Sequence, residues 1–363
     1  MIPLNVDIKT CRYHALIGVG GIGSGMFFRL NGDATLGREE SRSGYFLDRK
    51  DYCKLHIIAH YVRALLGPDF HTIPVGRVGD DDIGTRLVQE MAEAGLDTTY
   101  VERTQGSQTL FSFCFIYPDG SGGNMTTSDS ACSIVDPAYV LRAKPEFERY
   151  ANRGIALAAP EVSVDAREQL LKLATQNGFF RAASFTSEEM PRVVRSKILE
   201  SVDLLAINLE EAAAAVAMEV AGSDVQTIIE AAVGAFQKKN PAIQVSVTMG
   251  KNGSCCWDGN GVIWMPVRKV KVESTAGAGD AFLAGLLAGI TAGLPLHAAQ
   301  ELATLTGGDS VQSIHTINKK LDRDSLRTLS MESWAGISPE VQRLMEETNE
   351  RYDAHHAAVR SGS

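Results

Sequence analysis

The sequence predicts an α/β fold, in which a mostly parallel sheet is covered by helices on both faces and a small second sheet forms a lid. Two observations predict this arrangement. Short apolar runs alternate with amphipathic helical segments from about residue 14 to residue 293. Two turn-rich β segments, 24–50 and 107–130, interrupt this alternation. Because neither interruption has a helical period, we expect the two to form a small sheet beside the large one.

Each expected strand is a short apolar run bounded by turn residues. These runs span residues 14–20, 71–79, 109–117, 154–160, 203–208, 243–250 and 254–259. A further strand is expected at 266–273, where charged side chains alternate with valine. The expected helices place apolar residues on one face and span residues 82–95, 165–178, 208–220 and 279–293.

The lid segments carry their own turn signals, Asn31-Gly32 and Asp119-Gly120, which favour tight hairpins. From residue 330 onward the sequence is typical of an appended helix and tail. We therefore expect a main domain over residues 1–329, which includes the lid, and a C-terminal helical extension over residues 330–363.

The composition limits the classes of partner that the protein is expected to bind. The chain has 363 residues and a net charge of −9, which argues against nucleic acid or an anionic membrane surface. Without a leader pattern or a membrane-spanning apolar run, we expect a cytoplasmic protein. The six cysteines lack metal-binding spacing, and their apolar neighbours predict buried free thiols. The adjacent Cys255 and Cys256 should point to opposite faces of one strand.

The stretch 15–33 contains Gly18, Gly20 and Gly23 in the G-x-G-x-x-G spacing of dinucleotide-binding loops. Such a loop needs a helix directly behind it, because the helix N-terminus holds the pyrophosphate. Here the Asn31-Gly32 turn follows instead. We therefore expect the loop to allow a close backbone approach to a ligand, or a sharp turn between two strands. An NAD-dependent oxidoreductase is the less favoured alternative.

A second glycine-rich stretch, 275–279, leads directly into an amphipathic helix. Its backbone N–H groups would converge at the positive end of that helix, which suits phosphoryl oxygens. Asp280 at the same end would repel a bound anion, but it could take a proton from an attacking hydroxyl. From the residues alone, a simpler role for Asp280, in which its charge complements the helix dipole, stays open.

Four elements in a fixed order resemble a known family. The stretch ESTAGAGDAFLAG at 273–285 is similar to the (D/N)-T-x-G-A-G-D-x-F-x-x-G signature of the ribokinase-like (PfkB-type) carbohydrate kinases. Upstream, LLAINLEEA, VSVTMGKNGSCCWDG and VGRVGDDDIGTRL resemble the N-x-x-E, T-x-G-x-x-G and G-x-D-x-x-G elements of that family. The resemblance covers roughly residues 10–325. It implies a three-layer α/β/α core with a mostly parallel sheet and a small β lid.

The resemblance also implies roles for single residues. Asp280 would be the catalytic base, and Gly277, Ala278 and Gly279 would form the anion hole. Asn208 and Glu211 would help to position Mg²⁺, mainly through water. A helix capped by Asn208, with Glu211 in its first turn, would give the same pattern and is the alternative for this pair. Small or hydroxyl residues would line the nucleotide site, namely Thr248, Gly250, Gly253 and Thr275.

These roles imply an ATP-dependent kinase that transfers the γ-phosphate to a hydroxyl of a sugar, nucleoside or related polyol, with ATP and Mg²⁺ as cofactors. The alternative is a catalytically silent protein of the same fold that only binds its ligand. The resemblance also implies a homodimer formed through the lid. We expect neither nucleic acid nor a membrane as a partner.

The acceptor side departs from the family pattern. Ser24 or Gly25 stands where the first strand usually ends in Asp, and the paired glycines and Asn are missing from 51–67. Ser274 replaces an acid that supports a monovalent cation site in some members, so K⁺ activation is left open. Position suggests the following residues for acceptor binding: Gly20, Gly21, Ser24, Asn31, Asp33 and Asp51.

Overall fold

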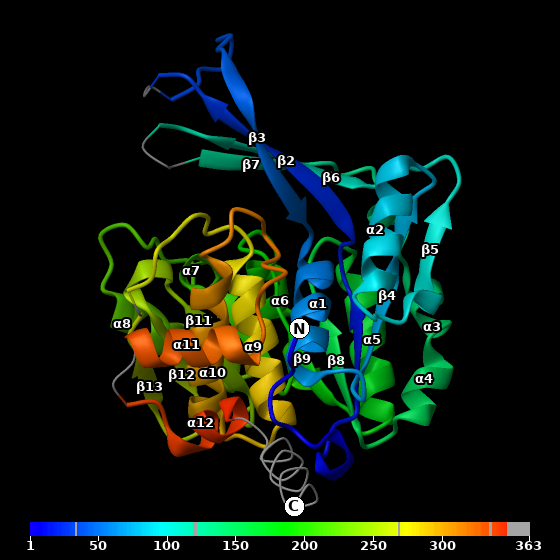
Figure 1. Cartoon of the computed structure of the whole chain (residues 1–363), viewed down its shortest axis with the longest axis vertical. Helices are drawn as coiled ribbons and strands as arrows, with labels where there is room; N and C mark the ends of the chain where they lie inside the picture. The colour runs from blue at the N-terminus through cyan, green and yellow to red at the C-terminus, as the bar shows by residue number, and fades with distance from the viewer. Residues whose placement is uncertain (33–34, 119–121, 268, 334–335, 347–363) are drawn as a thin grey trace, which may run out of the picture.

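The computed structural model describes residues 1–32, 35–118, 122–267, 269–333 and 336–346. Within them, nine strands form the large sheet in the order β13-β12-β11-β10-β9-β8-β1-β4-β5 (Figure 1). Neighbouring strands are parallel except for the antiparallel pairs β11–β12 and β12–β13. The strands are β1 (Ala15–Val19), β4 (His71–Gly79), β5 (Val101–Thr104), β8 (Gly154–Ala158), β9 (Phe180–Ala183), β10 (Leu204–Asn208), β11 (Gln244–Thr248), β12 (Ser254–Trp257) and β13 (Val262–Met265).

Helices cover both faces of this sheet, and each layer has its own apolar core. One layer contains α1 (Lys54–Leu66), α2 (Asp82–Glu93), α9 (Ala278–Thr291), α10 (Leu296–Ser310), α11 (Arg323–Ser333) and α12 (Pro339–Met345). The other contains α3 (Pro137–Leu141), α4 (Lys144–Arg149), α5 (Val164–Gln176), α6 (Met190–Arg195), α7 (Leu209–Ala215) and α8 (Val225–Gln237). Short 3₁₀ turns connect them: η1 (Ile8–Thr10), η2 (Thr98–Tyr100), η3 (Ala131–Ile134), η4 (Ile198–Ser201) and η5 (Gly250–Asn252). The predicted three-layer α/β/α core is confirmed.

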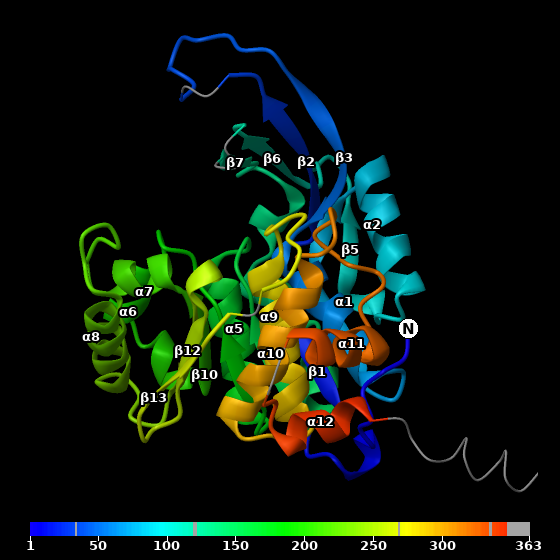
Figure 2. The same ribbon diagram turned by 60° about the vertical axis from the view of Figure 1, so that its left-hand side comes forward.

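The two β interruptions form one small sheet, as predicted. Its strand order is β3-β2-β6-β7, with β2 and β6 parallel and the other pairs antiparallel. This lid projects from the core beyond the N-terminus of α9 (Figures 1 and 2). Its strands are β2 (Gly23–Leu30), β3 (Gly44–Tyr52), β6 (Leu110–Ile116) and β7 (Gly122–Thr126).

A hinge network, formed by Arg86, Glu90, Ser24, Lys50 and Tyr52, ties the base of the lid to α2. Glu90 accepts hydrogen bonds from the Tyr52 hydroxyl at 2.7 Å and from Lys50 Nζ at 3.3 Å. Arg86 donates to Ser24 Oγ at 2.9 Å. Since α2 belongs to the core layer, these contacts set the position of the lid relative to the sheet.

The G-x-D-x-x-G element makes a second junction. Asp81 caps α2 by accepting from Gly84 N at 2.7 Å. The same carboxylate accepts from Thr109 N at 2.7 Å and from Thr109 Oγ1 at 2.6 Å. Thr109 directly precedes lid strand β6, so this part of the motif joins the lid to the core.

The predicted strand at 266–273 is wrong. Pro266 follows β13 and cannot donate to a strand ladder, and the described residues beyond it are not in a strand. Val267 and Val272 are exposed instead of packed. Charge alternation was a poor guide here because β13 already forms the edge of the sheet, so residues beyond it have no neighbouring strand.

The described residues beyond 329 pack against the main domain. The boundary expected at 330 falls inside α11, and Val341 and Leu344 of α12 pack in the core of the first helical layer.

Cys255 and Cys256 lie in opposite core layers, as predicted, and all six cysteines are unpaired. Among the described residues, no helix is both long and apolar enough to cross a membrane.

Candidate active site

The order of the strands creates a crevice between β1 and β8. From this pair the chain order runs outward both ways, to β4 and β5 on one side and to β9, β10 and β11 on the other. Small ligands bind at the carboxyl ends of parallel strands at such a switch point. Gly20 and Gly21 follow β1, while Asn208 and Thr248 end β10 and β11 as register partners. These four predicted residues therefore lie along one edge.

The N-terminus of α9 forms an open cradle at this edge. Gly277 caps the helix with φ of 79°, and a Cβ there would lie 2.7 Å from Thr316 O, so only glycine fits. Ala278 N donates to Thr275 O at 3.2 Å. The N–H groups of Gly279 and Asp280 have no hydrogen-bond partner among the described residues. Such a polarised, unpaired end suits phosphoryl oxygens.

Asp280 lies beside a lysine that the sequence interpretation left out. Lys54, the first residue of α1, places Nζ 3.7 Å from Asp280 Oδ1. The Asp280 side chain is 16% exposed. Burial raises the pKa of Asp280, and the Lys54 ammonium opposes this shift. The lysine therefore favours the ionised carboxylate that a base requires.

Glu161 is a second missed residue. It follows β8 with φ of 74°, a conformation that non-glycine residues rarely adopt. Its Oε2 accepts from Lys54 N at 3.3 Å. Burial raises the pKa of Glu161 to about 7, against the opposing charge of Lys54. A lone acid after an apolar run is a weak signal, and only the β1–β8 neighbourhood brings Glu161 to the site.

Gly21 makes room for Glu161. A Cβ at residue 21 would lie 2.2 Å from Glu161 Oε2 and 2.5 Å from Glu161 Cβ. Gly21 N also donates to Pro160 O at 2.9 Å. The glycine is therefore required by the close approach of the chain after β1 to the chain after β8.

Asp51 reaches the site from lid strand β3. It pairs with Gly25 in register, so its side chain lies on the Gly25 face of the lid. Burial raises the pKa of Asp51 to about 6, and the charge of Asp280 adds to this shift. A carboxyl group from β3 thus occupies the acceptor side, where the first strand supplies only Ser24 or Gly25.

The other acceptor-side predictions do not gather at this site. Ser24 Oγ donates a hydrogen bond to Asp51 O at 3.1 Å and accepts one from Arg86 at 2.9 Å. The Ser24 side chain therefore lies on the face of β2 opposite to Gly25. Asn31 lies just beyond the distal end of β2, where Nδ2 donates to Ser43 Oγ at 3.1 Å. Asp33 lies outside the described residues.

Asn208 and Glu211 form a capping box at the start of α7. Asn208 Oδ1 accepts from Glu211 N, and Glu211 Oε2 accepts from Asn208 N, both at 2.8 Å. The pair therefore does cap the helix, as the alternative predicted. The capping bonds use Glu211 Oε2 and leave Oε1 available to a metal-bound water. Among the described residues, no cluster of three or more His, Cys, Asp or Glu could enclose a metal. This donor set fits Mg²⁺ only as an ion held largely by water and phosphate oxygens.

Two glycines shape the predicted nucleotide side. Gly253 has φ of 90°, and a Cβ there would lie 2.2 Å from Met265 O. Gly250 has φ of 55° and faces open space. Both follow Thr248 at the carboxyl end of β11. Contact between these residues and a nucleotide stays a prediction.

The first glycine loop is followed by strand β2 instead of a helix, which removes the structural basis of the oxidoreductase alternative. Its glycines are explained by packing. A Cβ at Gly18 would lie 2.6 Å from Leu55 Cδ1, and one at Gly23 would lie 2.4 Å from Leu110 O. The loop makes the sharp turn between two strands that was one of its two predicted roles.

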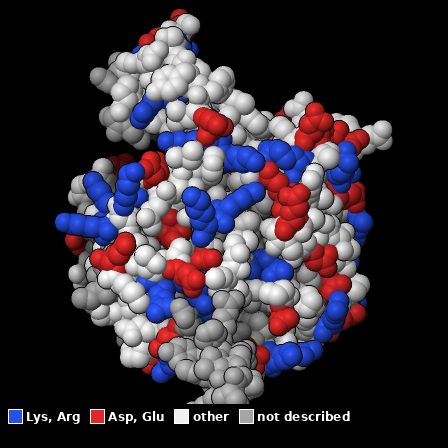
Figure 3. Space-filling view, in the orientation of Figure 1, with Lys and Arg blue, Asp and Glu red and all other residues white. Residues whose placement is uncertain are grey.

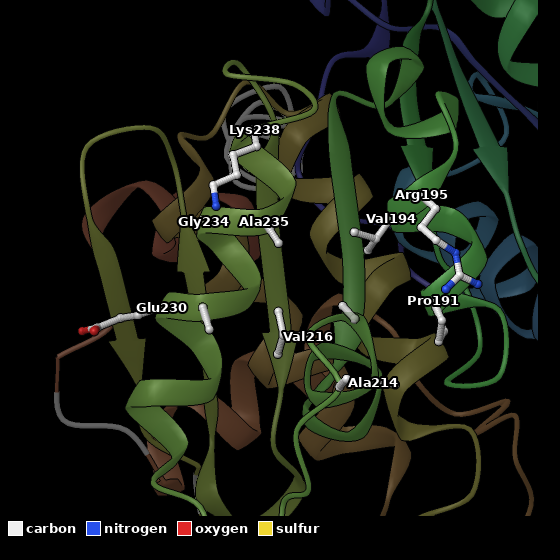
Figure 4. Close-up of a pocket in the computed structure, with 12 residues that line it drawn as sticks. Pro191, Val194, Arg195, Ala214, Val216, Glu230, Gly234, Ala235 and Lys238 are labelled. Atoms are coloured by element: carbon white, nitrogen blue, oxygen red, sulfur yellow. The ribbon is translucent and has the colours of Figure 1, made fainter.

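On the face seen in Figure 3, Lys and Arg side chains cluster where the lid meets the core. A separate pocket of about 580 Å³ lies between α6, α7 and α8, and half of its twelve lining residues are alanine or glycine (Figure 4). It contains none of the predicted site residues.

An open helix N-terminus, a carboxylate beside it and a lid at the same edge define a phosphotransferase with an alcohol acceptor. The chain belongs to the pfkB family of carbohydrate kinases, whose family model matches residues 62–323. It is 29% identical to fructoselysine 6-kinase from Shigella flexneri over 240 residues, covering 65% of this chain and 80% of that protein. It is 25% identical to adenosine kinase from Saccharomyces cerevisiae over 250 residues, covering 66% and 71%.

Solved structures agree on the fold. Ribokinase from Giardia lamblia superimposes with a TM-score of 0.74 at 16% identity, over 86% of this chain and 99% of that one. Ribokinase from Arabidopsis thaliana, complexed with ribose and ATP, superimposes with a TM-score of 0.69 at 20% identity, over 87% and 98%. The predicted ribokinase-like fold is confirmed.

Proposed function

We propose that the chain transfers the γ-phosphoryl group of ATP to a hydroxyl of a sugar, nucleoside or related polyol, with Asp280 as the general base. The observation that carries this proposal is the position of Asp280, beside Lys54 and at the unpaired N-terminus of α9. The family and its curated kinase relatives support the reaction class.

In this proposal Asp280 accepts the proton of the attacking hydroxyl as the oxygen approaches the γ-phosphorus. The N–H groups of Gly279 and Asp280 face the phosphoryl oxygens, where negative charge is spread during transfer. Asn208 and Glu211 would hold Mg²⁺ through water, and the ion would neutralise phosphate charge when bound. Ser274 offers a neutral hydroxyl, so no monovalent cation enters the proposal.

The acceptor would lie between the lid and the β1–β8 crevice. Asp51 and Glu161 offer carboxyl oxygens there, and both have raised pKa values because they are buried. Carboxyl groups of this kind bind sugar hydroxyls and orient one of them toward Asp280. Gly20 and Gly21 allow close approach at the floor of the same crevice.

Asp280→Asn tests the base assignment. We expect loss of phosphoryl transfer by about 10²- to 10⁴-fold, because the amide cannot accept the proton. Nucleotide binding, measured by calorimetry with a non-hydrolysable ATP analogue, should persist. Equal turnover by this variant would remove the assignment. A wild-type protein that binds a sugar but never consumes ATP would support the catalytically silent alternative.

We also propose a homodimer that forms through the outer face of the lid. Phe46 and Met125 are 61% and 57% exposed there, and Phe28 packs edge-on against Phe46 with ring centroids 5.0 Å apart. Exposed apolar surface of this kind is unusual unless it is covered by a partner. A second copy would present the same patch, which suits a twofold interface.

The use of ATP and the six free thiols fit a location in the cytoplasm.

A further inference from the structure

We infer that the phosphoryl acceptor is anionic, and that Arg49 and Arg29 on the lid bind its carboxylate or phosphate group. This inference rests on the proposed function, since it concerns the acceptor of that same site. It begins with the face of the lid that carries Asp51.

Arg49 reaches this face through a β-bulge. Gly25 pairs with Asp51 and Phe27 pairs with Leu47, so one residue of β2 is opposite three residues of β3. Bulges near active sites often redirect a side chain. Here the guanidinium of Arg49 lies over the Phe27 ring, 5.7 Å from its centroid. Phe27 is on the Gly25 face, since side chains alternate along a strand.

Arg49 is also close to the approach to α9. Lys271 and, more weakly, Arg49 lower the pKa of Glu273. Glu273 lies just before the glycine-rich stretch that opens α9. The positive charge of Arg49 therefore acts on a residue just before the start of α9.

Arg29 extends the positive surface along β2. It is two residues beyond Phe27 and lies on the same face. Arg29 is half-buried, and its Nε is buried without a hydrogen-bond partner among the described residues. Buried donors of this kind normally have a partner, and a bound anion would supply one. Within the described part of the chain, neither Arg29 nor Arg49 has an acidic group within 4.0 Å.

The spacing sets the shape of the acceptor. Gly25 and Arg29 are separated by four residues, or about 13 Å along an extended strand. The hydroxyl that reacts would lie near Asp51 and Asp280, while the anionic group would lie toward the distal lid. A sugar acid or a sugar phosphate, with its charge remote from the reacting hydroxyl, has this form.

The experiment measures binding first, without ATP. Neutral hexoses and pentoses are compared with the matching aldonic acids and sugar monophosphates by calorimetry. We expect at least one anionic sugar to bind about tenfold or more tightly than its neutral parent. The acid and phosphate arms identify which anion is preferred. If neutral parents bind as tightly as every anionic derivative, the inference is overturned.

Variants then assign the residues. Arg49→Gln and Arg29→Gln should each weaken binding of the anionic sugar by about 10- to 100-fold and leave the neutral parent unchanged. Arg42→Gln is the matched control, because Arg42 is on the same lid and is paired with Glu40. Melting temperatures check that each variant folds. An increase in the KM for ATP alone would assign the arginines to the nucleotide and overturn the inference.

Turnover separates this inference from the proposed function. Charge-selective binding without phosphoryl transfer would contradict the proposed function and leave the binding of an anionic ligand by Arg49 and Arg29 in place. Transfer to neutral sugars, with no effect of Arg49→Gln, would support the proposed function and contradict the anionic acceptor.

Discussion

Lys54 Nζ lies 3.7 Å from Asp280 Oδ1, and the two residues begin different helices, α1 and α9. The contact connects the chain that leaves the lid with the helix that carries the proposed base. It also opposes the effect of burial on Asp280, since a nearby cation stabilises the carboxylate.

Lys54→Met should move the acidic limb of the pH–rate profile to higher pH. Without the ammonium the pKa of Asp280 rises, so the base stays protonated over a wider range. A shift of about one pH unit or more is expected from the loss of a close opposite charge. Initial rates from pH 5 to 9 measure it. Lys54→Arg keeps the charge and should restore most of the profile, and an unshifted limb in Lys54→Met would contradict the coupling.

Gly21→Ala should destabilise the protein and disturb the acceptor side together. The new methyl group would overlap Glu161, whose Oε2 would lie only 2.2 Å from it. Forced overpacking of this kind costs about 1–3 kcal/mol. Urea unfolding measures the cost, and the KM for the acceptor should increase. Gly234→Ala in α8 meets no atom within 4 Å and should be neutral or stabilising.

Glu90→Ala should loosen the hinge network. The variant loses the bonds from Tyr52 and Lys50, so the lid is held less firmly. We expect the KM for the acceptor to rise by about 3- to 10-fold and ATP hydrolysis without acceptor to increase. Glu93→Ala, on the same helix but bonded only to Gln89 in the described structure, is the control. Equal kinetics in the two variants would rule out this role for the network.

His56 and His60 should make the fold sensitive to acid. Burial lowers the pKa of His56 to about 3 and that of His60 to about 4. Below about pH 6.5 the unfolded chain binds protons that the folded chain does not, so stability falls as the pH decreases. Each histidine costs about 2 kcal/mol at pH 5.

The histidine effect is isolated by His60→Leu, because the buried carboxyl groups of Asp51 and Glu161 act in the opposite sense. Between pH 7.5 and pH 5 the variant should lose about 2 kcal/mol less stability than the wild type in urea titrations. His71 is exposed, and His71→Leu should follow the wild type. Parallel curves for His60→Leu and the wild type would contradict the prediction.

Phe46→Glu should abolish the proposed dimer without affecting the fold. A carboxylate in the centre of the exposed aromatic patch would be buried without a partner in the interface. Sedimentation velocity at several concentrations measures the change. Tyr45→Glu is the control, since Tyr45 is exposed on the other face of β3. A wild-type monomer at every concentration would overturn the proposal.

The class of fold and the core of the phosphate site could be predicted from the order of residues alone. Alternating strands and helices predicted the layers because each element must bury one apolar face. The role of the stretch from Thr275 to Asp280 could also be predicted, since a glycine-rich turn, a helix N-terminus and an acid are all local features. Local features depend on neighbours along the chain, and a sequence displays those directly.

The residues that join Asp280 from distant parts of the chain were set by the packing of the folded molecule. Asp51 and Lys54 lie on either side of the β3–α1 junction, Glu161 follows β8, and all three are far from Asp280 in the chain. Their meeting depends on the β1–β8 neighbourhood and on the register of β3. A strand that shifts by one residue turns every side chain to its other face, which is why position suggested both Ser24 and Asp51 and only the register of β2 and β3 places them on opposite faces of the lid.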